Sequence, residues 1–124
     1  MRRAFMRRML ELATSDEGTA PAARVSGFRV AGKTGTARKL RDGKYIDAYV
    51  ASFVGFAPAS DARVVIAVMI DEPHGTRYYG GDVAAPVFSQ VAAGAMRALQ
   101  VAPDAPEASK MALATASESA TGAR

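Results

Sequence analysis

Two short apolar segments, and the brevity of the link between them, constrain this fold more than any other feature. Residues 49–57 (YVASFVGFA) and 63–71 (RVVIAVMID) have the length and composition of strands, and both are apolar on both faces. Only residues 58–62 connect them, which is far too short for a crossover helix. The two strands are therefore expected to be antiparallel neighbours inside a sheet that is covered on both sides.

A third strand and a hairpin turn precede this pair. Residues 25–36 predict the first strand, with Phe28 and Val30 on one face. Asp42-Gly43, in the charged stretch that follows, is a strong signal for the turn of a β-hairpin. We therefore expect three antiparallel strands in a row.

Helical periodicity predicts one helix at each end of the sheet. Apolar side chains at helical spacing indicate a short amphipathic helix over residues 3–13 and a second helix over residues 83–99. The expected fold class is therefore α+β. One helix across three strands leaves the other face open, although two of the strands are apolar on both faces. The chain thus lacks part of its own core, which indicates a fragment of a larger domain.

The composition changes after residue 102. Residues 103–124 are mainly Ala, Ser, Thr, Pro and scattered charge, with Met111 and Leu113 as their only large apolar side chains. Such a segment buries too little apolar surface to offset the entropy of ordering it. We expect one folded unit over residues 1–102 and a disordered tail over residues 103–124.

Composition and charge exclude several functions. With no Cys and one His, we expect no Cys/His zinc site, disulfide or thiol nucleophile, and neither a metal nor a cofactor. The longest apolar run, residues 64–70, is too short to span a bilayer, and Glu11 interrupts any signal-peptide core. The net charge of +4 equals that of the four arginines within residues 2–8, so nucleic acid is not an expected partner.

Residues 27–34 (GFRVAGKT) formally match the phosphate-binding loop of P-loop NTPases. That loop must follow a strand, curl around phosphates and open a helix. Here the inner residues prefer an extended chain, a polar turn precedes them, and no helical pattern follows. The NTPase stays as an alternative that its sequence context disfavours.

The first predicted strand, residues 25–36, ends in Lys33-Thr34-Gly35-Thr36, which contains the K-T-G signature of serine enzymes that handle penicillins. Lys33 can supply an ammonium group that tunes proton transfer near a serine nucleophile. Thr34 and Thr36 alternate onto one side of a strand, where their hydroxyls can hold a carboxylate. The N–H near Thr36 can stabilise an oxyanion, and Gly35 leaves room for a ligand along the strand edge.

Three blocks around this motif resemble the end of FtsI-type, division-specific peptidoglycan D,D-transpeptidases, which are class B penicillin-binding proteins. The blocks read RVAGKTGTARK, YVASFVGFAPASDARVVIAVMIDEP and YYGGDVAAPVFSQVAAGAMRAL, and they follow the family's order. The resemblance implies a partial penicillin-binding/β-lactamase-like fold, in which these are the last three of five antiparallel strands. The last helix would cross the sheet, and a helical subdomain would complete the cleft.

The resemblance also implies roles for individual residues. Lys33 would be the lysine of the family's third motif, and the backbone of Thr36 would form half of the oxyanion hole. The expected ligand is a peptidoglycan stem peptide ending in D-Ala-D-Ala, or a β-lactam, bound through the complete domain. The residues expected to bind it are Thr34, Gly35, Thr36, Arg38, Tyr49, Tyr78 and Tyr79.

Two of these assignments compete with plainer explanations. For the three tyrosines, ordinary packing is an equal alternative to an aromatic wall around the ligand. His74 is interpreted as a loop residue, because no G-x-S-x-G elbow accompanies it as a Ser-His-Asp triad would require.

Two of the family's motifs are absent from the chain. No serine is followed three residues later by lysine, and there is no Asn for the Ser-x-Asn motif. We therefore expect the chain by itself to form no acyl-enzyme. Division-machinery partners, and a periplasmic catalytic domain on an inner-membrane anchor, follow from the resemblance alone. The alternative is a remnant that acts only by association through exposed strand edges.

Overall fold

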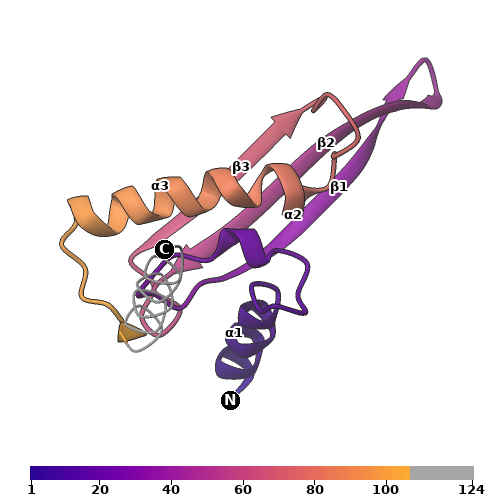
Figure 1. Ribbon diagram of the computed structural model, residues 1–124. Coiled ribbons are helices and arrows are strands. Elements are labelled where there is room, and N and C mark those ends of the chain that lie inside the picture. The colour runs from indigo at the N-terminus through magenta and orange to yellow at the C-terminus, as the bar shows by residue number, and fades with distance from the viewer. Residues whose placement is uncertain (107–124) are drawn as a thin grey trace, which may run out of the picture.

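The computed structural model describes residues 1–106 as a three-stranded antiparallel sheet with the two C-terminal helices packed on one face (Figure 1). This arrangement confirms the expected α+β class. The strands lie in the sheet in sequence order, with the second strand in the centre. The elements are α1 (Arg2–Leu12), η1 (Pro21–Ala23), β1 (Ala31–Arg41), β2 (Lys44–Ala57), β3 (Val64–Asp71), α2 (Gly80–Val83) and α3 (Ala85–Ala98).

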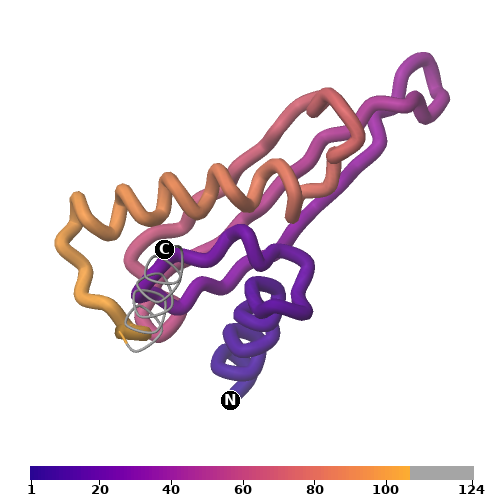
Figure 2. Tube along the Cα trace, viewed as in Figure 1, coloured from indigo at the N-terminus to yellow at the C-terminus, as the bar shows by residue number. Residues whose placement is uncertain are grey.

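The hairpin between β1 and β2 turns at Asp42-Gly43, as the sequence predicts. Both residues have positive φ, 51° and 75°, which is the backbone of a type I′ turn and suits the twist of the two strands. The paired strands run up to this turn on both sides and therefore extend further than the sequence indicates. The hairpin projects beyond the rest of the molecule as an arm (Figure 2).

The start of β1 differs from the prediction. The sequence indicates a strand from residue 25, but the strand begins at Ala31. A tight turn at Ser26-Gly27 folds Val25 back onto Phe28 as an isolated bridge, and Gly27 has a φ of 85° that suits a residue without a Cβ. The turn ends the extended conformation that the apolar side chains alone favour.

The core lies between the sheet and α3. Phe53 of β2 and Phe88 of α3 are fully buried and meet edge to face, with ring centroids 4.7 Å apart at 65°. Met96 is buried further along the same face of α3. Burial of these large side chains removes apolar surface from water and holds the helix on the sheet.

The C-terminal helix is divided where the sequence predicts a continuous one. It is interrupted at Ala84, between α2 and α3. Pro86 has no N–H to donate to the carbonyl of Asp82, so the first helical turn cannot join the second by a regular hydrogen bond. Because of this break, the short helix α2 begins at Gly80 and lies beside β1 and β2.

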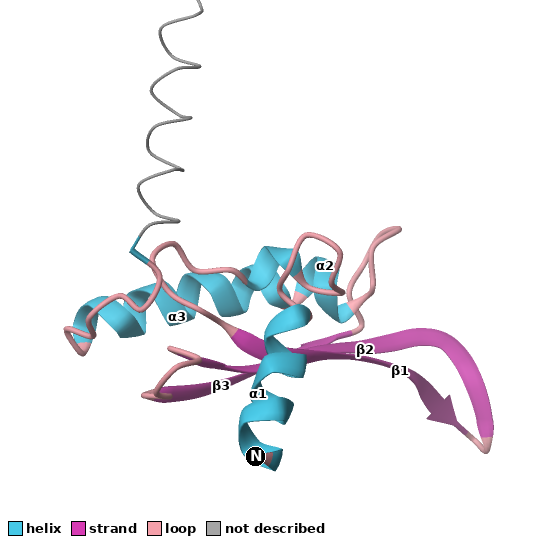
Figure 3. Ribbon diagram, turned by 90° about the horizontal axis from the view of Figure 1, so that it is seen from below, coloured by secondary structure: helices cyan, strands magenta, loops and turns pink. Residues whose placement is uncertain are grey.

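Most of the opposite face of the sheet is uncovered within residues 1–106 (Figure 3). At one end, Met6 and Leu10 of α1 line a cavity together with Phe56 and Val65. Burial alternates along β3, where Val68 lies under α3 whereas Val65 and Met69 are each 72% exposed. The helix α1 adds to the exposed apolar surface, because it has no buried residue and Phe5 and Met9 face solvent. This open surface agrees with the incomplete core that the sequence indicates.

The expected tail begins inside the described part of the chain. The carboxylate of Asp104 accepts hydrogen bonds from the backbone N–H of Arg29 (2.7 Å) and the hydroxyl of Ser60 (2.7 Å). The N–H of Ala105 binds the carbonyl of Gly27 at 3.0 Å. These contacts attach residues 104 and 105 to the folded unit, and the rest of the expected tail, residues 107–124, lies outside the described residues.

Candidate functional site

The K-T-G-T motif lies in the first half of β1, at the edge of the sheet. Thr34 pairs with Phe53 across β2 and Thr36 pairs with Ala51, so both hydroxyls lie on one face of the strand, which is the helix-covered face. Lys33 pairs with Val54 and is exposed on the opposite face. The strand therefore presents the ammonium group on one side of its edge and both hydroxyls on the other.

The hydrogen-bond alternation of the sheet fixes where the backbone of Thr36 points. The N–H of Glu72 binds the carbonyl of Tyr49 at 2.8 Å, so the odd-numbered residues of β2 bond to β3. The even-numbered residues, such as Ser52, must then bond to β1, where Ser52 pairs with Gly35. The N–H and carbonyl of the next residue, Thr36, consequently point away from β2 along the free edge.

The hydroxyls of the motif contact two loops. The backbone N–H of Gly80, at the start of α2, donates to Oγ1 of Thr36 at 3.1 Å. Oγ1 of Thr34 is 3.4 Å from Oγ1 of Thr19, in the loop that follows α1. A cavity of about 280 Å³ lies at this place, and its lining residues are Thr19, Thr34, Thr36, Tyr79, Gly80, Gly81 and Asp82.

Glycines allow α2 to approach β1 this closely. A Cβ on Gly80 would overlap the carbonyl oxygen of Ser52 and lie 2.7 Å from that of Gly35. A Cβ on Gly81 would overlap the carbonyl oxygen of Thr19. Sequence reasoning did not identify Gly80 or Thr19 as site residues, although the adjacent glycines of YYGGD were the available signal for a close backbone approach.

The three predicted tyrosines come together. The rings of Tyr49 and Tyr78 stack with centroids 4.0 Å apart at 16°, and Tyr79 lies against Tyr78 at 4.6 Å. The hydroxyls of Tyr78 and Tyr79 are 3.5 Å apart, and this contact is the main reason that the pKa of Tyr79 is raised. The cluster stands beside Gly80 and thus beside the hydroxyls of the motif.

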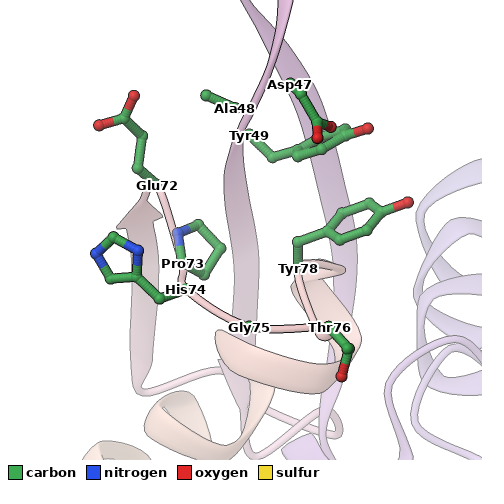
Figure 4. Close-up of a pocket in the computed structure, with 9 residues that line it drawn as sticks. All are labelled: Asp47, Ala48, Tyr49, Glu72, Pro73, His74, Gly75, Thr76 and Tyr78. Carbon is green, nitrogen blue, oxygen red and sulfur yellow. The ribbon is translucent and has the colours of Figure 1, made fainter.

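The loop between β3 and α2 encloses a second cavity, of about 410 Å³, beside the stacked rings (Figure 4). Its lining residues are Asp47, Ala48, Tyr49, Glu72, Pro73, His74, Gly75, Thr76 and Tyr78. His74 has no described hydrogen bond to a serine, which agrees with its interpretation as a loop residue. No group of three or more His, Cys, Asp and Glu residues within residues 1–106 is arranged to hold a metal ion.

Charged side chains of both signs lie around the motif, and Asp82 lines the same cavity as its hydroxyls. Nε of Arg38 donates to the carbonyl of Ile46 at 3.3 Å, which holds this guanidinium against the hairpin. Nζ of Lys39 lies 3.0 Å from Asp71 and 3.5 Å from Glu72, and the hydrogen bond with Asp71 raises the pKa of Lys39. Lys33 bonds only to the carbonyl of Thr34, at 3.0 Å, among the described contacts.

The same geometry excludes the P-loop alternative. Gly32, Lys33 and Thr34 are residues of an extended strand, and β1 continues to Arg41 where a phosphate-binding loop would open into a helix. The match of residues 27–34 to that pattern is therefore coincidental.

Comparison with protein families identifies the family of the chain. A family model described as the penicillin binding protein transpeptidase domain matches residues 4–93. The chain belongs to this transpeptidase family. This membership confirms the resemblance that the three sequence blocks indicate.

Two individual relatives support this family assignment. The probable peptidoglycan D,D-transpeptidase PenA of Neisseria flavescens is 49% identical over 102 residues, which cover 82% of this chain and 26% of that protein. The peptidoglycan D,D-transpeptidase FtsI of Escherichia coli K12 is 43% identical over 98 residues, which cover 78% of this chain and 17% of that protein.

A solved structure confirms the partial transpeptidase fold. The apo TP domain of penicillin-binding protein 3 from Burkholderia pseudomallei matches with a TM-score of 0.72 at 47% identity, and the match covers 79% of this chain and 30% of that one. The chain thus spans less than a third of the length of these relatives. No helix within residues 1–106 is both long and apolar enough to cross a membrane.

Proposed function

We propose that this chain forms the C-terminal wall of the active site of a D,D-transpeptidase that cross-links peptidoglycan during cell division. The observation that carries the proposal is the K-T-G-T motif on a free sheet edge. There the N–H of Thr36 points outward, and the hydroxyls of Thr34 and Thr36 share one face. A substrate that lies along this edge would meet all three donors at once.

The two threonines would bind the terminal carboxylate of a D-Ala-D-Ala stem peptide or of a β-lactam. Oγ1 of Thr36 accepts a hydrogen bond from Gly80, so its own proton is available to donate. Arg38 lies on the same face of β1, two residues further on, and would add positive charge for the carboxylate. Gly35 would keep the edge between them free of a side chain.

The chemical step would use the edge and its opposite face. The outward N–H of Thr36 would provide one donor of an oxyanion hole for the tetrahedral intermediate. Lys33, exposed on the other face, would supply a positive charge close to a serine nucleophile that another part of the domain contributes. Tyr49, Tyr78 and Tyr79 would form an aromatic wall beside the carboxylate site.

The whole enzyme would act in the periplasm, on an inner-membrane anchor and together with division proteins. The chain by itself would be inactive, because it contains neither the Ser-x-x-Lys nor the Ser-x-Asn motif. The purified chain should therefore not be labelled covalently by a fluorescent penicillin. A labelled band that unlabelled penicillin suppresses would contradict this expectation.

A chimera tests whether this segment can form part of an active transpeptidase site. Residues 17–103 would replace the matching segment of E. coli FtsI, and acylation by fluorescent penicillin would be followed in time. The parent chimera should be labelled, and Lys33→Ala should slow acylation by about a hundredfold, as loss of a proton-transfer group does. Lys44→Ala, which removes the same charge at the hairpin tip, should not change the rate. Equal labelling of the Lys33→Ala chimera and its parent would rule out the role of Lys33.

A further inference from the structure

A hydroxyl outside the K-T-G-T motif lies next to the proposed carboxylate site. Oγ1 of Thr19, in the loop between α1 and η1, is 3.4 Å from Oγ1 of Thr34. Both side chains line the cavity of about 280 Å³ that Thr36 also lines. The distance is long for a hydrogen bond between hydroxyls, but such contacts in active sites often tighten only in the complex with substrate. Thr19 is therefore placed to act on Thr34.

The surrounding backbone holds Thr19 in this place, although its side chain is exposed. A Cβ on Gly18 would overlap the carbonyl oxygen of Ala13, and a Cβ on Gly81 would overlap the carbonyl oxygen of Thr19 itself. Ala20, the next residue, is fully buried, and its N–H donates to the carbonyl of Ala13 at 2.7 Å. The loop thus packs tightly against the end of α1 and against α2, and these contacts fix an exposed hydroxyl beside the motif.

The charge of the cavity makes the direction of its hydroxyl protons important. Among the lining residues, all within residues 1–106, Asp82 is the charged one, and its charge is negative. A carboxylate bound there must therefore be held mainly by O–H and N–H protons that point toward it. A hydroxyl can donate or accept, so it binds a carboxylate well only when its own proton is directed to the ligand.

The two motif hydroxyls have comparable neighbours. Oγ1 of Thr36 accepts the N–H of Gly80 at 3.1 Å, which leaves the proton of Thr36 available to donate. Oγ1 of Thr34 has the hydroxyl of Thr19 as its neighbour in the same cavity. If Thr19 donates to Thr34, the proton of Thr34 is likewise available for the carboxylate, and each hydrogen bond of this chain polarises the next.

We propose that Thr19 is a positioning residue of the carboxylate site. Its hydroxyl donates to Oγ1 of Thr34 and thereby directs the proton of Thr34 to the carboxylate of a β-lactam or a stem peptide. This inference rests on the proposed function of the K-T-G-T edge. The site then orients the two hydroxyls of β1 with one donor from the loop after α1 and one from Gly80 of α2.

Acylation kinetics of a chimera test this role. Residues 4–103 would replace the matching segment of E. coli FtsI, so that the loop keeps its hydrogen bond with Ala13. Acylation rates for benzylpenicillin and for its methyl ester, which has no carboxylate charge, would be measured by competition with a fluorescent penicillin. Thr19→Val should slow acylation by benzylpenicillin by about three- to tenfold and leave the rate for the ester unchanged. Thr19→Ser keeps the hydroxyl and should retain the parent rate for both compounds.

A double variant separates action through Thr34 from a general effect on the site. Thr34→Val should slow acylation by benzylpenicillin at least as much as Thr19→Val. Adding Thr19→Val to Thr34→Val should have no further effect, because the hydroxyl on which Thr19 acts is gone. Ser15→Ala is the matched control in the same loop, because it removes the hydroxyl that donates to the carbonyl of Leu12 at 2.7 Å and should change neither rate. Urea unfolding of the full 124-residue chain verifies that each variant folds.

The possible outcomes distinguish the role of Thr19 from the proposed function. A labelled parent chimera that is slowed by Thr34→Val but not by Thr19→Val would overturn the role of Thr19 alone. The same conclusion would follow if Thr19→Val slowed the acid and the ester equally, or had its full effect in the Thr34→Val background. A parent chimera that no penicillin labels would overturn the proposed function, and the role of Thr19 with it.

Discussion

The two edges of the sheet differ in chemistry although the same central strand supports both. The edge formed by β1 carries Lys33, Lys39 and Arg41, has a register shift between Arg38 and Leu40, and receives the N–H of Gly80 from α2. The edge formed by β3 is apolar, regular and uncovered on one face. Charges and irregularities keep the first edge from pairing with another strand, whereas residues 64–70 of the second edge contain neither a charge nor a bulge.

This difference indicates what each edge is for. An edge that is protected against strands yet has a glycine and two hydroxyls is suited to a small ligand with an anionic end. An edge without protection is suited to burial under protein. Because the chain spans less than a third of its relatives' length, the unprotected edge is also where the rest of a transpeptidase domain would be expected to attach.

Among the substitutions that test this difference between the edges, the largest loss of stability is expected from Gly80→Ala. The new methyl group would overlap the backbone of Ser52, so α2 must move away from β1, and the free energy of unfolding should fall by about 1–3 kcal/mol. Gly94→Ala on α3 is the matched control, because its Cβ meets open space and alanine favours the helix by about 0.5–1 kcal/mol. Urea unfolding measures both. Equal effects of the two substitutions would mean that α2 does not seal the β1 edge.

A smaller loss of stability is expected from Thr36→Val. It removes the acceptor of the Gly80 N–H and leaves that buried donor without a partner, which should cost about 1–2 kcal/mol. Thr34→Val alters only the long contact with Thr19 and should cost less than about 0.5 kcal/mol. Hydrogen exchange at the Gly80 amide should accelerate in the first variant only. Unchanged protection there would remove the link between β1 and α2.

The smallest change in stability is expected at the ion pair of Lys39, which reaches from β1 across the sheet to Asp71 at the end of β3. The hydrogen bond with Asp71 raises the pKa of Lys39 above its ordinary value of 10.5. The stabilisation is therefore complete below the ordinary pKa and is lost as the pH rises through the higher pKa of the folded state. An NMR titration of the Lys39 side chain should show the raised pKa, and Asp71→Asn should return it toward the ordinary value. Asp47→Asn is the control and should leave it unchanged.

Local signals in the sequence predicted the elements whose causes are local. Asp42-Gly43 defines its turn because both residues tolerate positive φ, and the two helices follow from periodicity. The short link before β3 requires an antiparallel neighbour. The start of β1 was predicted wrongly because apolar residues 25–30 resemble a strand. In the folded chain the N–H of Arg29 bonds to the carboxylate of Asp104, and the N–H of Ala105 bonds to the carbonyl of Gly27. These long-range contacts stabilise a turn at this place instead of a strand.

The candidate site shows the same division between features with local causes and features that depend on distant contacts. The motif, the alternation of Thr34 and Thr36, and the three tyrosines were predicted by residue number before their positions were known. Thr19 and Gly80 were not, since each contacts the motif only through the tertiary fold. No short-range pattern in the sequence specifies a contact between residues so far apart in the chain.

The sequence by itself thus determined the class of fold, the incomplete core and the identity of the motif residues, because periodicity and side-chain chemistry are properties of neighbouring residues. Only the tertiary structure decided which face of β1 each motif side chain occupies, where the N–H of Thr36 points, and that β1 and β3 form the two edges of the sheet within residues 1–106. These depend on strand register and on the order of strands in the sheet. Both are set by contacts between residues distant in the chain, and the hydrophobic pattern alone leaves several arrangements open.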